Sequence, residues 1–192
     1  MDLDKLLNKN QKEAAVYLDS NLRIIAGAGS GKTRVVTYRI AYLIDEIGVA
    51  PYKILAITFT NKAANEMKER VANLLGPHSM GTLICTIHSL CVRILRQHIN
   101  VINYPSNFMI MDEEDQKALL KKIYNKLTID SKAISLKSML TTISNYKMAN
   151  VSPQRALELA GQFEGEIKKA KIYQEYVDYQ ENHFMLDFDD LL

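Results

Sequence analysis

The sequence predicts an α/β fold, a parallel sheet flanked by helices, joined to a second part that is all-helical. Two observations support this prediction. In the first hundred residues, short apolar runs alternate with longer amphipathic stretches, which is the pattern of repeated β–α units. From about Asp112 onward only helical periodicity is found. The chain therefore combines a sheet-containing half with a helical half.

Composition allows a globular domain with one insertion and excludes few functions. The chain has 192 residues, of which 47% are hydrophobic and 24% are charged. No apolar run is long enough to span a membrane, and the first residues lack a signal-peptide core, so we expect a cytoplasmic protein. Residues 1–100 carry 13 basic against 8 acidic side chains, whereas the remainder carry 11 against 14. This distribution permits a nucleic-acid surface without requiring one.

The first β–α unit is predicted to be a strand at Leu22–Ala26 followed by a helix from about Lys32 to Glu46. A glycine-rich stretch joins the two. Its glycines let the backbone fold so that N–H groups point at a polyphosphate. Lys32 would reach the β- and γ-phosphates, and the Thr33 hydroxyl would bind Mg²⁺. The first position of the usual G-x-x-x-x-G-K-[ST] pattern is Ala26, a departure at one place.

Two further β–α units follow. Strands are predicted at Ile54–Phe59 and Leu83–Ile87, with helices over about 62–75 and 90–99. Ligands of parallel sheets bind at the carboxyl ends of the strands. The phosphate-binding loop, Thr58–Asn61 and Thr86–His88 all lie at such ends, so we expect them on one edge.

The second half is predicted to be helical. Asp112 can cap a helix whose first turn is acidic, and Ser152-Pro153 can open another. Two apolar stripes are expected to form the core. They are Leu119, Leu120, Ile123, Tyr124 and Leu127 in the first helix, and Phe163, Ile167, Ala170, Tyr173 and Val177 in a longer one. Residues 106–185 are therefore interpreted as a helical insertion.

Five segments, taken together and in order, carry a resemblance to a known family. They are Leu7–Gln11, Ala26–Arg34, Ile54–Ala64 followed by Glu66, Met67 and Arg70, Gly81–Ser89, and Leu186–Leu192. This set resembles the N-terminal part of superfamily-one DNA helicases of the UvrD/PcrA/Rep type. The resemblance covers nearly the whole chain, and it implies a P-loop NTPase (RecA-like) fold with a helical insertion subdomain.

The resemblance also implies roles for individual residues. Gln11 would bind the adenine edge and Arg34 would lie against the nucleotide. The implied nucleotide-binding set is Gln11, Ala26, Gly27, Ala28, Gly29, Ser30, Gly31, Lys32, Thr33 and Arg34, with ATP and Mg²⁺ as cofactors and Lys32 and Thr33 as the catalytic contributors. The implied DNA-binding set is Phe59, Asn61, Thr86 and His88. Phe59 would stack on bases of single-stranded DNA, as a sequence-tolerant motor requires.

The leading hypothesis is the N-terminal fragment of an ATP-dependent DNA helicase. Residues 1–105 would belong to the motor domain, 106–185 to the insertion, and 186–192 to the return into the motor domain. The intact protein would couple ATP hydrolysis to 3′-to-5′ translocation and unwinding at junctions of single-stranded and duplex DNA, as a monomer. The fragment alone would not turn ATP over.

Acidic residues keep two other interpretations open. Asp112-Glu113 follows an apolar run and could supply the magnesium-binding acid of a self-contained P-loop ATPase or kinase, although a helix cap explains it as well. Asp187, Asp189 and Asp190 form a second acidic group that we do not expect to bind metal. A non-enzymatic module, in which residues 106–185 bind protein or duplex DNA, is the third hypothesis.

Overall fold

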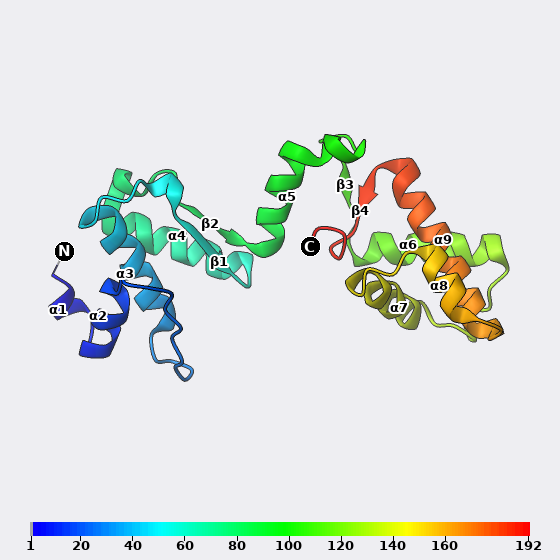
Figure 1. Ribbon diagram of the computed structural model, residues 1–192, viewed down its shortest axis with the longest axis horizontal. Coiled ribbons are helices and arrows are strands. Elements are labelled where there is room, and N and C mark those ends of the chain that lie inside the picture. The colour runs from blue at the N-terminus through cyan, green and yellow to red at the C-terminus, as the bar shows by residue number, and fades with distance from the viewer. Residues whose placement is uncertain (1) are drawn as a thin grey trace. The chain divides into compact units, whose positions relative to one another are not determined.

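The computed structural model describes residues 2–192 as a mixed α/β molecule, mostly helical, with two small parallel sheets (Figure 1). The chain forms two compact units, one ending at Leu90 and the other comprising Cys91–Leu192. The division falls inside helix α5 (Ile87–His98). The limits 1–105, 106–185 and 186–192 stay a prediction. None of the helices in the described chain combines the length and the apolar character needed to cross a membrane.

The first unit contains four helices and a two-stranded sheet within the described residues. The elements are α1 (Leu3–Leu6), α2 (Lys9–Val16), α3 (Lys32–Asp45), β1 (Leu55–Thr58), α4 (Asn61–Leu75) and β2 (Leu83–Thr86), with 3₁₀ turns η1 (Pro51–Lys53) and η2 (Gly76–Ser79). The strands run parallel, and Thr58 pairs with Thr86 at their carboxyl ends. The strands predicted at Ile54–Phe59 and Leu83–Ile87 are confirmed as β1 and β2. The helices predicted over about 32–46 and 62–75 are confirmed as α3 and α4.

Helices α3 and α4 pack on one face of this sheet. The core between them is Ile40, Ile54, Ala56, Ala64, Met67, Val71 and Ile84. Because side chains alternate along a strand, Ala56 is buried whereas its neighbours Leu55 and Ile57 are about half exposed. The opposite face of the sheet is therefore partly open to solvent.

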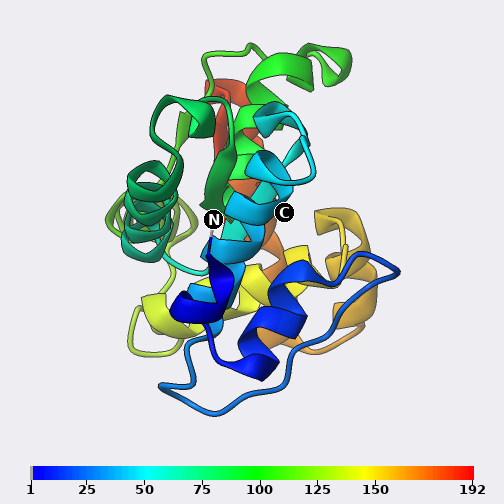
Figure 2. The same ribbon diagram turned by 90° about the vertical axis from the view of Figure 1, so that its left-hand side faces the viewer.

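The predicted first strand, Leu22–Ala26, is wrong. Figure 2 shows the chain between α2 and α3 as an open loop, without regular structure over residues 21–27. Ile25 is 84% exposed. A strand is stable where its backbone N–H and C=O groups are hydrogen-bonded to a neighbouring strand. No described strand pairs with this segment. The apolar pattern is present, but the partner that would bury it is not.

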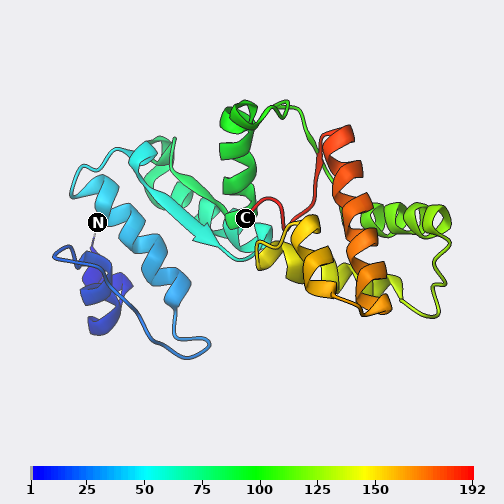
Figure 3. The ribbon, with the colours of Figure 1, turned by 45° about the vertical axis from the view of Figure 1, so that its right-hand side comes forward.

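The second unit is mainly a helical cluster. It contains most of α5, then η3 (Ile99–Ile102), β3 (Met109–Ile110), α6 (Glu113–Leu127), α7 (Leu136–Met148), α8 (Pro153–Ala160), α9 (Glu164–His183) and β4 (Met185–Leu186). Helices α6 to α9 share one core that includes Leu120, Ile143 and Tyr176. Figure 3 shows β4 continuing directly from the end of α9. It pairs in parallel with β3, so Met185 lies opposite Met109.

Both predicted helix caps of this unit are confirmed. The Asp112 carboxylate accepts hydrogen bonds from the backbone N–H groups of Glu114 and Asp115, each at 2.9 Å. The Ser152 hydroxyl accepts from the Arg155 N–H at 3.1 Å. The prediction that Phe163 belongs to the core is wrong, because Phe163 precedes α9 as its cap residue and its side chain is exposed.

Candidate nucleotide and nucleic-acid sites

Gln11 connects the start of α2 to the loop over residues 26–33, which is predicted to bind phosphate and is called the phosphate-binding loop for that reason. Its backbone N–H donates to the Asn8 side chain at 2.9 Å, and its side-chain oxygen accepts from the Asn8 N–H at 3.1 Å. This reciprocal capping box leaves the Gln11 amide group to donate to the Ser30 carbonyl at 3.0 Å. Local helix capping therefore positions the side chain that the resemblance assigns to adenine.

Two glycines of the loop have conformations that favour glycine. Gly29 and Gly31 have φ angles of 74° and 84°, in the left-handed region. A Cβ atom on Gly31 would also lie only 2.8 Å from the Gln11 side-chain nitrogen. The turn therefore favours glycine at position 31, and a side chain there would also have to shift the amide of Gln11.

The side chain of Lys32 is exposed, and its ammonium group contacts the loop that precedes it. The ammonium group donates to the carbonyls of Ala26, at 2.8 Å, and Gly27, at 2.6 Å. The Ser30 hydroxyl donates to the same Gly27 carbonyl at 2.7 Å. The loop thus contacts a positive charge at the first residue of α3, where helix N–H groups also favour anions.

A pocket of about 260 Å³ lies beside this loop and α2. It brings Gln11 and Lys32 to one cavity, together with apolar side chains of the open loop. The lining residues are Asn8, Asn10, Gln11, Ala14, Ile24, Ile25, Ala26, Ser30, Lys32 and Val35. A positive charge, amide groups and apolar surface in one cavity suit a ligand with an anionic end and a flat organic part.

Thr33 and Arg34 follow at the start of α3. The Thr33 carbonyl accepts a hydrogen bond from the Thr37 hydroxyl at 2.9 Å. The Arg34 guanidinium donates to the Leu6 carbonyl at 2.7 Å and lies 5.6 Å from the centre of the Tyr38 ring. Arg34 lines another pocket, whose wall also includes residues of α4. The structure therefore does not bring Arg34 into the cavity that holds Gln11 and Lys32.

The residues expected to contact DNA gather at the carboxyl edge of the β1–β2 sheet. Phe59 directly follows β1 and is 98% exposed. Asn61 is the first residue of α4, whose cap is the Thr60 hydroxyl. An exposed aromatic ring beside a helix N-terminus is a suitable surface for a base and its phosphate.

Thr86 and His88 lie on the same edge, because Thr86 pairs with Thr58. Thr86 is buried, and its hydroxyl accepts from the Ser89 N–H at 3.2 Å and shares a hydrogen bond of 2.9 Å with the Ser89 hydroxyl. His88 stands in the first turn of α5 and is half-buried. Thr86 thus also starts a helix, a local role that the sequence reasoning did not assign to it.

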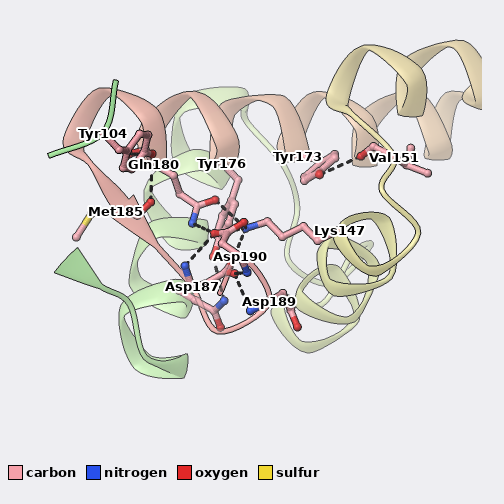
Figure 4. Close-up of polar contacts among 11 residues, drawn as sticks. Tyr104, Lys147, Val151, Tyr173, Tyr176, Gln180, Met185, Asp187, Asp189 and Asp190 are labelled. Atoms are coloured by element: carbon pink, nitrogen blue, oxygen red, sulfur yellow. Dashed lines mark hydrogen bonds and ion pairs between the residues drawn. The ribbon is translucent and has the colours of Figure 1, made fainter. Parts of the chain in front are cut away.

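The acidic group at the end of the chain forms a buried ion cluster (Figure 4). The Lys147 ammonium lies 2.7 Å from carboxylate oxygens of both Asp187 and Asp190. The Tyr176 hydroxyl donates to Asp187 at 2.8 Å, and the Gln180 amide donates to Asp190 at 2.7 Å. Sequence reasoning missed this cluster because Lys147 is forty residues from Asp187 and carries no local signal.

The cluster shifts the acidity of its members in opposite directions. Burial opposes ionisation of Asp187, but the charge of Lys147 and the hydrogen bonds from Lys147 and Tyr176 outweigh it, so the pKa of Asp187 is lowered. Burial, with the negative charge of Asp187, raises the pKa of Asp190 in spite of Lys147. One ammonium therefore balances one carboxylate fully and the other only in part.

Asp112 and Glu113 are engaged within their own helix. Asp112 caps α6, and Glu113 forms an ion pair of 2.9 Å with Lys117. Hydrogen bonding and the charge of Lys117 lower the pKa of Glu113. The structure favours the helix-cap interpretation of these acids over the magnesium-binding one. Over residues 2–192, no group of three or more His, Cys, Asp or Glu side chains is placed to hold a metal ion.

Comparison with known proteins identifies relatives across nearly the whole chain. Residues 7–192 match the family model described as the UvrD/REP helicase N-terminal domain. An ATP-dependent DNA helicase PcrA from Bacillus subtilis (strain 168) is 47% identical over 189 residues, which is 97% of this chain and 25% of that protein. PcrA from Staphylococcus epidermidis (strain RP62A) is 45% identical over 190 residues, covering 99% of this chain and 26% of the relative. This chain thus spans about a quarter of the length of these relatives.

Proposed function

Because the chain belongs to the UvrD/REP helicase N-terminal domain family, we propose that it is the N-terminal part of an ATP-dependent DNA helicase with a RecA-like P-loop fold. The observation that carries the proposal is the hydrogen bond between the Gln11 amide and the Ser30 carbonyl. This hydrogen bond joins the start of α2, which would bind the adenine base, to the loop that would bind the phosphates. Residues 1–105 and 186–192 would form part of the motor domain, and 106–185 its helical insertion.

ATP would bind in the cavity beside the loop. The Lys32 ammonium would exchange the carbonyls of Ala26 and Gly27 for phosphate oxygens, and the Gln11 amide would turn from Ser30 to the adenine edge. Thr33, adjacent to Lys32, would supply a hydroxyl to Mg²⁺. One hydroxyl suffices from this part of the protein, since Mg²⁺ in nucleotide sites takes further ligands from phosphates and water. When bound, the ion neutralises charge on the phosphates.

Single-stranded DNA would lie along the carboxyl edge of β1 and β2. Phe59 offers an exposed ring on which a base can stack, an interaction worth about 1–3 kcal/mol per base. Asn61, Thr86 and His88 would contact the strand beside it. In the intact protein, this edge and the ATP cavity would couple hydrolysis to 3′-to-5′ translocation and to unwinding at junctions, in a cytoplasmic monomer.

The chain by itself would bind both ligands without turning ATP over. Hydrolysis requires an acid to help hold Mg²⁺ and a group to position the attacking water. The candidate acids of the helical unit have other partners. Asp112 caps helix α6, and Asp187 forms an ion pair with Lys147.

The test measures nucleotide and DNA binding separately on matched variants. Lys32→Ala should lose binding of a fluorescent ATP analogue with Mg²⁺ and keep binding of an oligothymidine, measured by anisotropy. Phe59→Ala should show the reverse. Tyr52→Ala, which removes another exposed aromatic ring from the same unit, is the control and should change neither. DNA-stimulated ATP turnover by the isolated chain, or equal DNA binding by Phe59→Ala and Tyr52→Ala, would contradict the proposal.

A further inference from the structure

The guanidinium group of Arg39 lies at the end of helix α2. One of its nitrogens is within hydrogen-bonding distance of three backbone carbonyl oxygens, those of Tyr17 at 2.5 Å, Ala14 at 3.2 Å and Ala15 at 3.4 Å. Arg39 belongs to α3 and is at least 22 residues away from each of them in the sequence. A single side chain of α3 therefore binds the last turn of α2.

Helix α2 has no positive side chain of its own at this end. The last carbonyls of a helix find no partner within it, and the last turn of α2, residues 13–16, contains no basic residue. A helix of eight residues is also too short to be stable by itself. The Arg39 guanidinium supplies the hydrogen-bond donors and the positive charge that a helix C-terminus favours. The end of α2 therefore depends on a side chain of α3.

The contacts at the end of α2 also fix its start, where Gln11 lies. Ala15 is one helical turn after Gln11, so the two are on the same face. Ala15 is completely buried in a small core with Val35 of α3, and Val35 also lines the cavity of Gln11 and Lys32. A helix of eight residues is a rigid unit about 12 Å long, so a contact at one end restrains the other. Arg39 and the core around Ala15 thus hold Gln11 beside the cavity.

The role of Arg39 becomes larger when ATP binds as proposed above. The Gln11 amide would then leave the Ser30 carbonyl for the adenine edge, and the hydrogen bond between α2 and the loop would be lost. Arg39 does not line the cavity, so its hydrogen bonds to α2 need not change. Arg39 can therefore keep α2 in place while Gln11 binds the base.

We propose that Arg39 is a positioning residue for recognition of the base, acting through α2 and Gln11. The inference rests on the proposed function, which assigns the adenine edge to Gln11. Adenine presents a donor and an acceptor on the edge at which guanine presents two acceptors, so a side-chain amide bound there distinguishes the two bases. Loss of Arg39 should therefore reduce the preference for ATP over GTP. Binding of the phosphates, which depends on Lys32, should persist.

The experiment compares the binding of ATP, GTP and tripolyphosphate, each with Mg²⁺, to the full 192-residue chain by isothermal titration calorimetry. Arg39→Met should weaken ATP binding about tenfold, the value of one or two hydrogen bonds, and leave tripolyphosphate binding unchanged. Arg39→Lys, which keeps a positively charged donor, should recover most of the loss. Lys68→Met removes an exposed positive charge from α4 and is the matched control, which should bind all three ligands as the wild type does.

A double variant tests whether Arg39 acts through Gln11. Gln11→Ala should lose the same preference for ATP, and Arg39→Met should weaken ATP binding no further in that background. Losses that multiply in the double variant would overturn the inference, because they would be independent. Arg39→Met binding ATP as Lys68→Met does would overturn it too. So would an equal loss of ATP, GTP and tripolyphosphate binding in Arg39→Met, since Arg39 would then only support the fold.

Failure of the proposed function would give a different result. If the wild type binds ATP and GTP equally well, or if Gln11→Ala keeps the preference for ATP, the assignment of Gln11 to the base is wrong and the inference fails with it. If Gln11→Ala loses the preference and Arg39→Met keeps it, Gln11 binds the base without help from Arg39, and the inference alone is overturned.

Discussion

The Lys147 ammonium lies 2.7 Å from a carboxylate oxygen of Asp187, and almost no solvent reaches either side chain, with 8% and 0% exposed. Lys147 is near the end of α7, and Asp187 directly follows β4. The pair therefore attaches the last residues of the chain to the helical cluster. Removing one partner of a buried pair is costly, because the remaining charge keeps its desolvation penalty without compensation.

Replacing Lys147 with Met should destabilise the second unit by about 3–5 kcal/mol, because two buried carboxylates lose their counter-charge. The free energy of unfolding, obtained from urea denaturation followed by circular dichroism, measures this effect. Lys126→Met is the matched control. It breaks an ion pair of 2.6 Å with Glu175 in which Lys126 is largely exposed, and should cost less than about 1 kcal/mol. Equal losses in the two variants would contradict the role of Lys147.

The opposite pKa shifts of Asp187 and Asp190 predict a pH dependence that Asp190→Asn can reveal. Asp190 has a raised pKa in the folded state, so its contribution to stability is full below its unfolded value of about 3.8 and is lost as the pH rises through the folded pKa. The lowered pKa of Asp187 has the reverse sign, because its contribution is present above about 3.8 and is lost as the pH falls.

Asp190→Asn removes the first of these contributions, while Asp187 keeps its interactions with Lys147 and Tyr176. The unfolding free energy of the variant, relative to the wild type, should therefore increase between about pH 4 and pH 7. Urea denaturation of both proteins at the two pH values measures the difference. A difference that stays constant, or that decreases toward neutral pH, would show that Asp190 does not have a raised pKa.

Replacing Gly31 with Ala should destabilise the first unit by at least about 1–2 kcal/mol, the cost of a left-handed conformation for a residue with a side chain. It should also weaken ATP binding, because the new Cβ would displace the Gln11 amide from Ser30. Thermal unfolding and nucleotide titration measure the two effects. Gly165→Ala is the control, since Gly165 lies in α9 with open space around it, and there alanine should stabilise by up to about 1 kcal/mol.

Asp112→Ala should lower the free energy of unfolding by about 0.5–2 kcal/mol, because α6 loses its cap. Asp112→Asn should keep most of the stability, since an amide oxygen also caps a helix. Binding of ATP with Mg²⁺ should be unchanged in both variants. If Asp112→Asn instead remained stable and lost Mg²⁺-dependent binding, Asp112 would be a metal ligand.

The comparison of predicted and observed strands shows where sequence patterns suffice. Ile54–Phe59 and Leu22–Ala26 are similar apolar runs. The first contains β1 because β2 pairs with it along Leu55–Thr58. The second finds no partner strand in the described chain and remains an open loop. An apolar run expresses only a tendency to be buried, and pairing with another strand decides whether it forms a strand.

The sequence by itself determined the features that depend on neighbouring residues. The caps at Asp112 and Ser152, the turn at Gly31 and the order of the phosphate-binding loop before α3 all follow from side chains within three or four positions of one another. Tertiary structure alone decided the distant contacts, namely Lys147 with Asp187, Gln11 with Ser30, and Arg34 with Arg70 around one cavity. The physical reason is that these contacts depend on how separate helices and loops pack, which no local spacing of residues encodes.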